Sequence, residues 1–170
     1  MIRIRAMRDE DAEQVLAIYR EGIATGHATF ETDTPDWDKF SASRLEKPRL
    51  VSLDSRDQVT GWAVMSAVSS RCVYGGVGES TVYVAEAARG QGVGHALLNA
   101  FLLAAEQAGF WSVQAGIFPE NTGSIRLHES CGYRPVGTFI RQGKMRHGPM
   151  EGQWRDVHYM QWRSTRTGVD

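Results

Sequence analysis

Long apolar runs and an excess of charge of either sign are both missing from this sequence. No apolar stretch approaches the roughly 20 residues that a membrane-spanning helix needs, so we expect no membrane partner. Lys and Arg number 19 and Asp and Glu number 20, which leaves a formal net charge of −1. Because nucleic-acid binding relies on a basic surface, this balance predicts no nucleic-acid partner.

Cysteine is also scarce, since Cys72 and Cys131 are the only two. Two cysteines do not make a disulfide framework, and neither lies in a motif that would mark an acyl-enzyme nucleophile. The opening M-I-R-I-R-A-M is too short and too charged for a secretory signal, and it alternates like a strand. These features favour a cytoplasmic location.

The residues that are present indicate one mixed domain. A length of 170 residues fits a single domain, expected at residues 1–163 with a flexible tail at 164–170. Hydrophobic periodicity predicts the order β-α-α-β-β-β-α-β-α-β-β, an α+β (mixed α/β) arrangement around one sheet. The expected helices span 9–24, 35–45, 92–108 and 121–131, and the expected strands span 1–7, 49–54, 59–70, 79–86, 111–118, 133–142 and 154–163.

The most informative stretch is R-G-Q-G-V-G at residues 89–94, between a predicted strand and a predicted helix. Glycine inside a helix costs about 1 kcal/mol relative to alanine, so three glycines at alternate positions need a reason. Unpaired N–H groups and the helix dipole favour an anion at such a helix start, and glycine lets a phosphate approach the backbone. Arg89 adds a positive charge. We interpret the turn as a pyrophosphate site; a glycine-rich helix entry that binds nothing is the structural alternative.

Two common nucleotide motifs do not fit this turn. A P-loop needs a Lys followed by Ser or Thr after its last glycine, and none is present. A Rossmann dinucleotide site needs the spacing G-x-G-x-x-G near the start of a βαβ unit, whereas here the spacing is G-x-G-x-G in the middle of the chain.

The turn instead resembles the acyl-CoA pyrophosphate loop of the GNAT superfamily of N-acetyltransferases, whose pattern is Q/R-x-x-G-x-G/A. Arg89, Gly90, Gly92 and Gly94 match it, with Gln91 between them. Asn121 begins the next helix and H-E-S-C-G-Y ends it, which is similar to the family's second motif. The resemblance covers residues 1–163 and implies the GNAT fold, a central, mostly antiparallel sheet of about seven strands flanked by about four helices.

Further segments resemble the phosphinothricin and methionine-sulfoximine/sulfone acetyltransferases of that superfamily, namely A-T-F-E-T with a following P-D-W, E-S-T-V-Y-V, N-T-G-S-I-R-L-H-E and W-R-D-V. The resemblance implies acetyl transfer from acetyl-CoA to the α-amine of a small amino-acid-like substrate. It also implies direct attack in a ternary complex, no metal, and a homodimer. Two alternatives stay open: a GNAT enzyme for another amine (a protein N-terminus or a polyamine), or a non-catalytic acyl-CoA-binding module. The lack of an acidic cluster beyond residues 9–13 argues against polycations.

The resemblance assigns three candidate catalytic residues. Glu79 is the candidate base that takes the proton of the substrate ammonium, through water; an exposed glutamate at a sheet edge is the alternative. His128 is a general acid for the leaving thiolate or a structural histidine. His147 is a second candidate base, and either it or Lys144 could occupy the family position before the last strand.

The resemblance also assigns two sets of binding residues. Arg71 would pair with a substrate carboxylate through its guanidinium, unless it is a surface arginine in a loop. Asn121 would contact the CoA arm, cap its helix, or do both. Trp154, Asp156 and His158 alternate along the last strand, which favours sheet and dimer support first and a place in the pocket second. The acetyl-CoA set is Val82, Tyr83, Val84, Arg89, Gly90, Gln91, Gly92, Val93, Gly94, His95 and Asn121, and the substrate set is Phe30, Glu31, Ser69, Ser70, Arg71, Glu79, Ser80 and Thr81.

Overall fold

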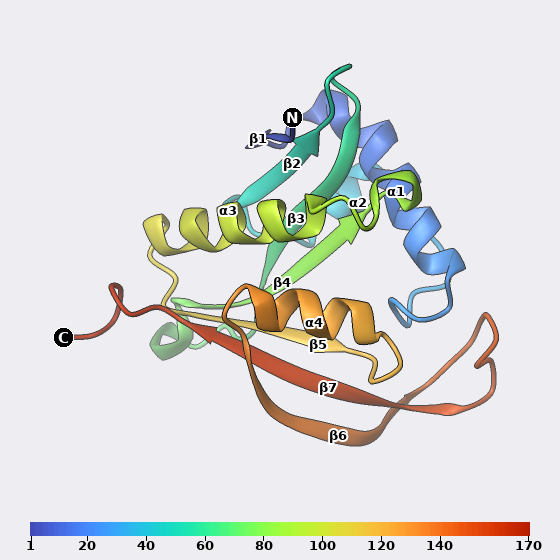
Figure 1. The fold of residues 1–170 in the computed structure, drawn as a ribbon. Coiled ribbons are helices and arrows are strands. Elements are labelled where there is room, and N and C mark those ends of the chain that lie inside the picture. Colours follow the sequence, from blue (N-terminus) through green and yellow to red (C-terminus); the bar gives the residue numbers. More distant parts are fainter.

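The computed structural model describes residues 1–170 and forms one sheet with helices on both faces (Figure 1). Three short 3-10 turns at Asp9–Asp11, Cys72–Tyr74 and Glu86–Ala88 complete the regular structure. The elements are β1 (Arg3–Ala6), α1 (Ala12–Ala24), α2 (Trp37–Ala42), β2 (Arg49–Leu53), β3 (Val59–Ala67), β4 (Val77–Val84), α3 (Val93–Gln107), β5 (Ser112–Ile117), α4 (Thr122–Ser130), β6 (Arg134–Lys144) and β7 (Trp154–Arg163). The mixed architecture expected from the sequence is confirmed.

The seven strands lie in the order β1-β2-β3-β4-β5-β7-β6, and every neighbouring pair is antiparallel except β4 and β5. That parallel pair is short, because it joins only residues 77–79 to residues 112–114. β4 then remains paired with β3 up to Val84, while β5 runs on along β7. The edge of β4 from Ser80 to Val84 therefore faces an opening instead of a strand.

Two apolar cores hold the helices against the two faces of the sheet. On one face, Leu97, Phe101 and other residues of α3 pack on Ala63 and Met65 of β3. On the other face, α1 and α2 pack on Trp62 and its neighbours. Alternate β3 residues enter opposite cores, as the two-residue period of a strand requires. Figure 1 shows α3 and α4 together on one side of the sheet, with both N-termini near the opening beside β4.

The second helix begins later than the sequence suggested. Thr34 and Pro35 precede it, and its N-cap is Asp36, whose carboxylate accepts the backbone N–H of Lys39 at 2.9 Å. A carboxylate satisfies an unpaired N–H of the first turn and favours the positive end of the helix dipole. Both Thr34 and Asp36 are good caps by composition, so only the backbone geometry distinguishes them.

The segment after β7 packs against α3, which differs from the flexible tail expected from residue 164. Ser164 is buried, and its hydroxyl donates to the Glu106 carboxylate. The same hydroxyl oxygen accepts the N–H groups of Arg166 (3.0 Å) and Thr167 (2.8 Å). Arg166 also pairs with Glu106. A polar segment without hydrophobic periodicity is thus held by hydrogen bonds and an ion pair, which periodicity cannot detect.

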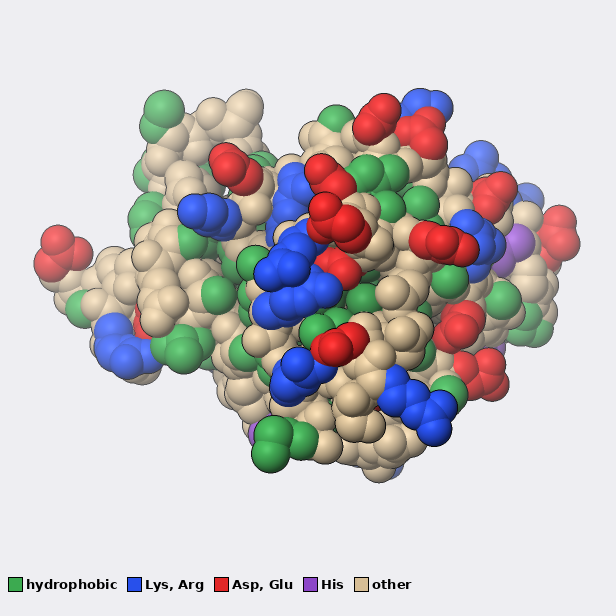
Figure 2. All heavy atoms as spheres, turned by 90° about the horizontal axis from the view of Figure 1, so that it is seen from above, with side chains coloured by type: hydrophobic (Ala, Val, Ile, Leu, Met, Phe, Trp, Pro, Cys, Tyr) green, Lys and Arg blue, Asp and Glu red, His purple; other side chains and the backbone are tan.

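No helix combines the length and the apolar character needed to cross a bilayer. On the face shown in Figure 2, Lys and Arg side chains lie next to Asp and Glu side chains, as expected from the near-zero net charge.

Candidate functional site

A cavity of about 1110 Å³ occupies the opening between β4 and β5. Its wall combines the β4 edge, the first turns of α3 and α4, and the loop that follows α1. It contains residues from both sets expected from the sequence, including Phe30, Glu31, Glu79, Gly92 and Asn121. The opening in the sheet thus joins the glycine turn at one end to Glu79 at the other.

The glycine turn has two different reasons for its glycines. Gly90 and Gly92 have φ values of +73° and +80°, the left-handed region that other residues adopt at a cost. An added Cβ at either position would meet nothing within 4 Å, so the space above the turn is open. Gly94 is different, because a Cβ there would lie 3.1 Å from Leu127 on α4. Two glycines therefore shape the turn and the third lets α3 and α4 pack closely.

Gly92→Ala is expected to weaken acetyl-CoA binding. The substitution places a side chain at φ +80°, which costs about 1–2 kcal/mol for a residue other than glycine. Relaxing that strain would turn the first N–H groups of α3 away from a bound phosphate. Calorimetric titration with acetyl-CoA measures the effect. Gly137→Ala is the matched control, because Gly137 also has open space around it but no positive φ; equal affinity in both variants would contradict the role of the turn.

The exposed edge of β4 offers backbone groups to the cavity. The N–H of Ala85 donates to the Thr60 carbonyl on β3 at 2.9 Å. Because backbone groups of successive strand residues point to opposite edges, those of Val82 and Val84 point away from β3. They face the side from which β5 has diverged, where the Val84 carbonyl accepts a hydrogen bond from Arg89 Nε at 3.3 Å, while both N–H groups and the Val82 carbonyl point into the opening.

Glu79 stands on β4 where the parallel pairing with β5 ends. Its carboxylate accepts a hydrogen bond from the Gln114 side chain at 3.2 Å and lines the cavity. Burial raises the pKa of Tyr159, and the negative charge of Glu79 adds to that rise, which identifies the two side chains as neighbours. Two other carboxylates line the cavity: Glu31 is exposed, and Glu120 is paired with Arg155. Among the three carboxylates of the cavity wall, Glu79 is thus the one that is half-buried and forms no ion pair.

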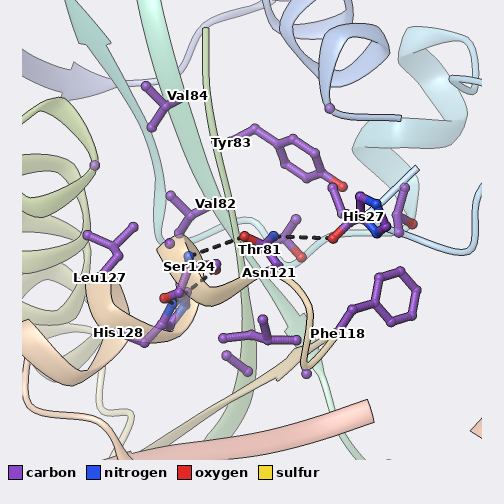
Figure 3. A pocket seen from close by; sticks show the side chains of 18 of the residues that line it. His27, Thr81, Val82, Tyr83, Val84, Phe118, Asn121, Ser124, Leu127 and His128 are labelled. Atoms are coloured by element: carbon purple, nitrogen blue, oxygen red, sulfur yellow. Dashed lines mark hydrogen bonds between the residues drawn. The ribbon is translucent and has the colours of Figure 1, made fainter. Parts of the chain in front are cut away.

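The α4 end of the cavity is held by side-chain hydrogen bonds (Figure 3). Asn121 caps α4 by accepting the N–H of Ser124, and its amide donates to the His27 carbonyl, both at 3.2 Å. His128 donates from Nδ1 to the Ser124 carbonyl at 2.7 Å, and burial lowers its pKa. A neutral imidazole with its only ring proton in that bond is a poor proton donor. The geometry therefore favours a structural role for His128 over a role as general acid.

Several residues expected at the site do not line the cavity. Ser69, Ser70 and Arg71 lie in the loop before β4, where the Arg71 guanidinium sits 5.6 Å from the Tyr74 ring centre and is exposed. Gln91 instead folds back to donate to the Ala87 carbonyl. His147 contacts the loop after α1, where its Nε2 lies 3.3 Å from the Thr29 carbonyl oxygen, and it does not line the cavity. Lys144 at the end of β6 is exposed and also lies outside the cavity.

Two arginines at or beneath the cavity were not predicted from the sequence. Arg44, which follows α2, lines the cavity and donates from Nη1 to the Ser66 hydroxyl at 3.0 Å. Arg155 is fully buried beneath the cavity, 1% exposed, with its guanidinium 3.9 Å from the Phe118 ring centre. No local motif marks either arginine, because their partners are distant in sequence.

Arg155 joins three segments of the wall. It donates to the Gly26 carbonyl at 3.0 Å and to His27 Nδ1 at 3.1 Å, and it pairs with the Glu120 carboxylate at 3.2 Å. Because Nδ1 of His27 accepts, its ring proton lies on Nε2. Arg155 thus orders the loop after α1 against β7 and the start of α4. No group of three or more His, Cys, Asp or Glu side chains is arranged to hold a metal ion.

Known proteins resemble this chain in sequence and in fold. Residues 4–133 match the profile of the acetyltransferase (GNAT) family. The chain is 33% identical over 167 residues to a phosphinothricin N-acetyltransferase of Alcaligenes faecalis, covering 93% of this chain and 80% of that protein. It is 29% identical over 156 residues to an L-methionine sulfoximine/L-methionine sulfone acetyltransferase of Pseudomonas aeruginosa, covering 89% and 88%. A GNAT superfamily phosphinothricin acetyltransferase from Sinorhizobium meliloti, crystallised with acetyl-CoA, aligns with a TM-score of 0.86 at 29% identity, covering 99% and 91%.

Proposed function

Because this chain belongs to the GNAT family of acetyl-CoA-dependent N-acetyltransferases, we propose that its acceptor is the α-amine of a small amino-acid-like compound of the phosphinothricin, methionine sulfoximine or methionine sulfone type. The amine attacks acetyl-CoA directly in a ternary complex. One observation carries the proposal: a single cavity joins the glycine turn to the Glu79 carboxylate through the opening beside β4.

Acetyl-CoA fits the donor end of this cavity. Its pyrophosphate would lie at the turn of Arg89, Gly90 and Gly92, where the backbone is open and the α3 N-terminus is positive. Its pantetheine arm and thioester oxygen would meet the backbone N–H groups of Val82 and Val84 and the Val82 carbonyl at the β4 edge. Acetyl-CoA supplies the activated acyl group, and the chain supplies the alignment and the N–H groups that face the thioester oxygen.

Glu79 acts at the acceptor end. An ammonium cannot attack a carbonyl, so one proton must leave the acceptor nitrogen first. The Glu79 carboxylate takes that proton, through a water, while the Gln114 side chain holds the carboxylate in place. The new N–C bond forms as the C–S bond breaks, and the sulfur leaves with the electron pair as the CoA thiolate. The acylated nitrogen then gives its second proton to that thiolate through water, which yields the neutral amide and free CoA.

The test is thiol release from acetyl-CoA with a panel of amines: phosphinothricin, methionine sulfoximine, methionine sulfone, common amino acids, spermidine and short peptides. We expect turnover with the sulfoximine-type compounds. A signal confined to peptides or spermidine would favour a GNAT enzyme for another amine. Binding of acetyl-CoA with no turnover across the panel would favour a non-catalytic acyl-CoA-binding module.

We also propose that the protein is a homodimer through β6 and β7. β6 is an edge strand that is exposed along almost its whole length. Val136, Phe139 and Ile140 are 61%, 57% and 69% exposed, and Trp154 on β7 is 52% exposed. Large apolar side chains on an edge strand favour binding of a second chain. Binding would bury the apolar surface and would pair the free backbone N–H and C=O groups of the edge.

Ile140→Asp is expected to convert the dimer into a monomer, because it buries a charge in the apolar interface. Sedimentation velocity at micromolar protein concentration measures the result. Leu103→Asp on α3 is the matched control, since Leu103 is an exposed apolar residue (48%) on another element. A wild-type protein that sediments as a monomer would refute the proposed interface.

A further inference from the structure

Arg44 is a positively charged residue of the cavity wall, and no carboxylate forms an ion pair with it. Its guanidinium is held by the Ser66 hydroxyl at 3.0 Å and lies 5.6 Å from the centre of the Phe40 ring. Its Nε is buried and has no hydrogen-bond partner. None of the five ion pairs within 4.0 Å involves Arg44. Arg44 is half-buried, an arginine stays charged at any accessible pH, and charges that are partly removed from water are normally paired. A negatively charged group that binds next to Arg44 would therefore be stabilised.

The position of Arg44 relates it to the proposed base. Ser66 on β3 is directly opposite Glu79 on β4 in the antiparallel register. Directly opposite residues project to the same face with Cβ atoms about 4.5–5.5 Å apart. Ser66 thus holds the Arg44 guanidinium on the same face of the sheet as the Glu79 side chain, the face that carries α1 and α2, and the two charged groups stay more than 4.0 Å apart. An unpaired cation and an unpaired carboxylate on one face match a molecule that carries an ammonium and a carboxylate on one carbon.

Neutral hydroxyl groups surround the same place. Tyr19 and Tyr83 line the cavity, and burial raises the pKa of both phenols, so they stay protonated. The charge of Arg44 acts on both rings in the opposite sense, which identifies them as its neighbours. Glu31 contributes a negative charge from the exposed rim, more than 4.0 Å from the guanidinium. The inner surface around Arg44 therefore offers one cation and two uncharged donors.

We propose that Arg44 binds the α-carboxylate of the acceptor amino acid and thereby selects amines that carry this group; the inference rests on the proposed function. Arg71, the arginine expected for this role from the sequence, lies outside the cavity. The Arg44 charge disfavours polyamines by repulsion. It also disfavours peptide N-termini, whose α-carbon carries an amide instead of a carboxylate.

The test uses L-methionine sulfone and its α-carboxamide, which share the α-amine and differ only at the acid. We expect kcat/KM of the wild-type enzyme for the acid to exceed that for the amide by roughly 10- to 100-fold, the range of one charged hydrogen-bond pair. Arg44→Gln should remove this preference by slowing the acid alone, with acetyl-CoA affinity unchanged. Arg44→Lys should restore part of it, because lysine keeps the charge without the planar fork. Arg20→Gln, on the exposed side of α1, controls for the loss of one positive charge.

Three results would overturn the inference: an unchanged acid-to-amide ratio in Arg44→Gln, loss of the ratio in Arg71→Gln instead, or no preference in the wild type. Failure of the proposed function looks different, because the wild type would then acetylate neither compound. In that case calorimetric binding of methionine sulfone in the presence of CoA decides. Binding that is lost in Arg44→Gln supports the anion site, and absent or unaltered binding refutes it. Circular dichroism melting of each variant identifies a loss that is due to misfolding.

Discussion

Replacing Glu79 by glutamine is expected to lower kcat for acetyl transfer by roughly 100- to 10,000-fold, the usual contribution of a positioned general base. Glutamine keeps the size of the side chain and can still meet Gln114, but it cannot take a proton. Because the glycine turn and the β4 backbone groups are unchanged, the affinity for acetyl-CoA should stay as in the wild type. Steady-state kinetics with the best acceptor, together with calorimetric binding of acetyl-CoA, measure the two effects separately.

The pH dependence of the Glu79→Gln variant gives an independent check. Without a base, only the acceptor fraction that is already deprotonated in solution reacts, so the residual rate should rise with pH across the alkaline range. Glu129→Gln serves as the control, since Glu129 is an exposed carboxylate on α4 without a partner. A Glu79→Gln enzyme with wild-type kcat would remove Glu79 from the mechanism and direct attention to His147.

Arg155→Met is expected to destabilise the protein by roughly 2–4 kcal/mol, since it leaves the buried Gly26 carbonyl and His27 Nδ1 without their donor. Methionine fills a similar volume next to Phe118, so a cavity is not the cause. The loop after α1 should also lose its order against β7, which would raise KM for the acceptor more than the Kd of acetyl-CoA. Urea unfolding at equilibrium measures the stability change.

Glu120→Gln separates the ion pair from the other Arg155 contacts. Glu120 is 45% exposed but pairs with the buried Arg155 guanidinium, so this variant should cost about 1–2 kcal/mol, more than a fully exposed pair, while the glutamine oxygen can still accept a hydrogen bond. Arg155→Lys should fall between the two, because lysine reaches one acceptor but not all of them. Equal stability of Arg155→Met and the wild type would mean that the buried arginine does not order the loop.

The order of strands and helices could be predicted from the sequence, and so could the position of the glycine turn before α3. Both depend on local patterns: the short apolar run of Trp62–Met65, the helical spacing of Leu97 and Phe101, and the glycines at 90 and 92. Hydrophobic periodicity and φ preference act over a few residues, so they can be recognised in the sequence without a structure. The fine boundaries are not, as the cap at Asp36 and the packing of Ser164 illustrate.

By itself, the sequence determined the mixed α/β fold, the resemblance to the acetyltransferase family, a glycine turn at the start of a helix, and the place of Glu79 on the strand before that turn. Only the tertiary structure decided which side chains meet in the cavity. The divergence of β4 from β5 depends on pairing between strands 35 residues apart, as at Glu79 and Gln114. Arg44 enters the cavity because Ser66 on β3 holds it, whereas Arg71 stays outside. Such contacts arise from how the sheet and helices pack, and no short stretch of sequence contains both partners.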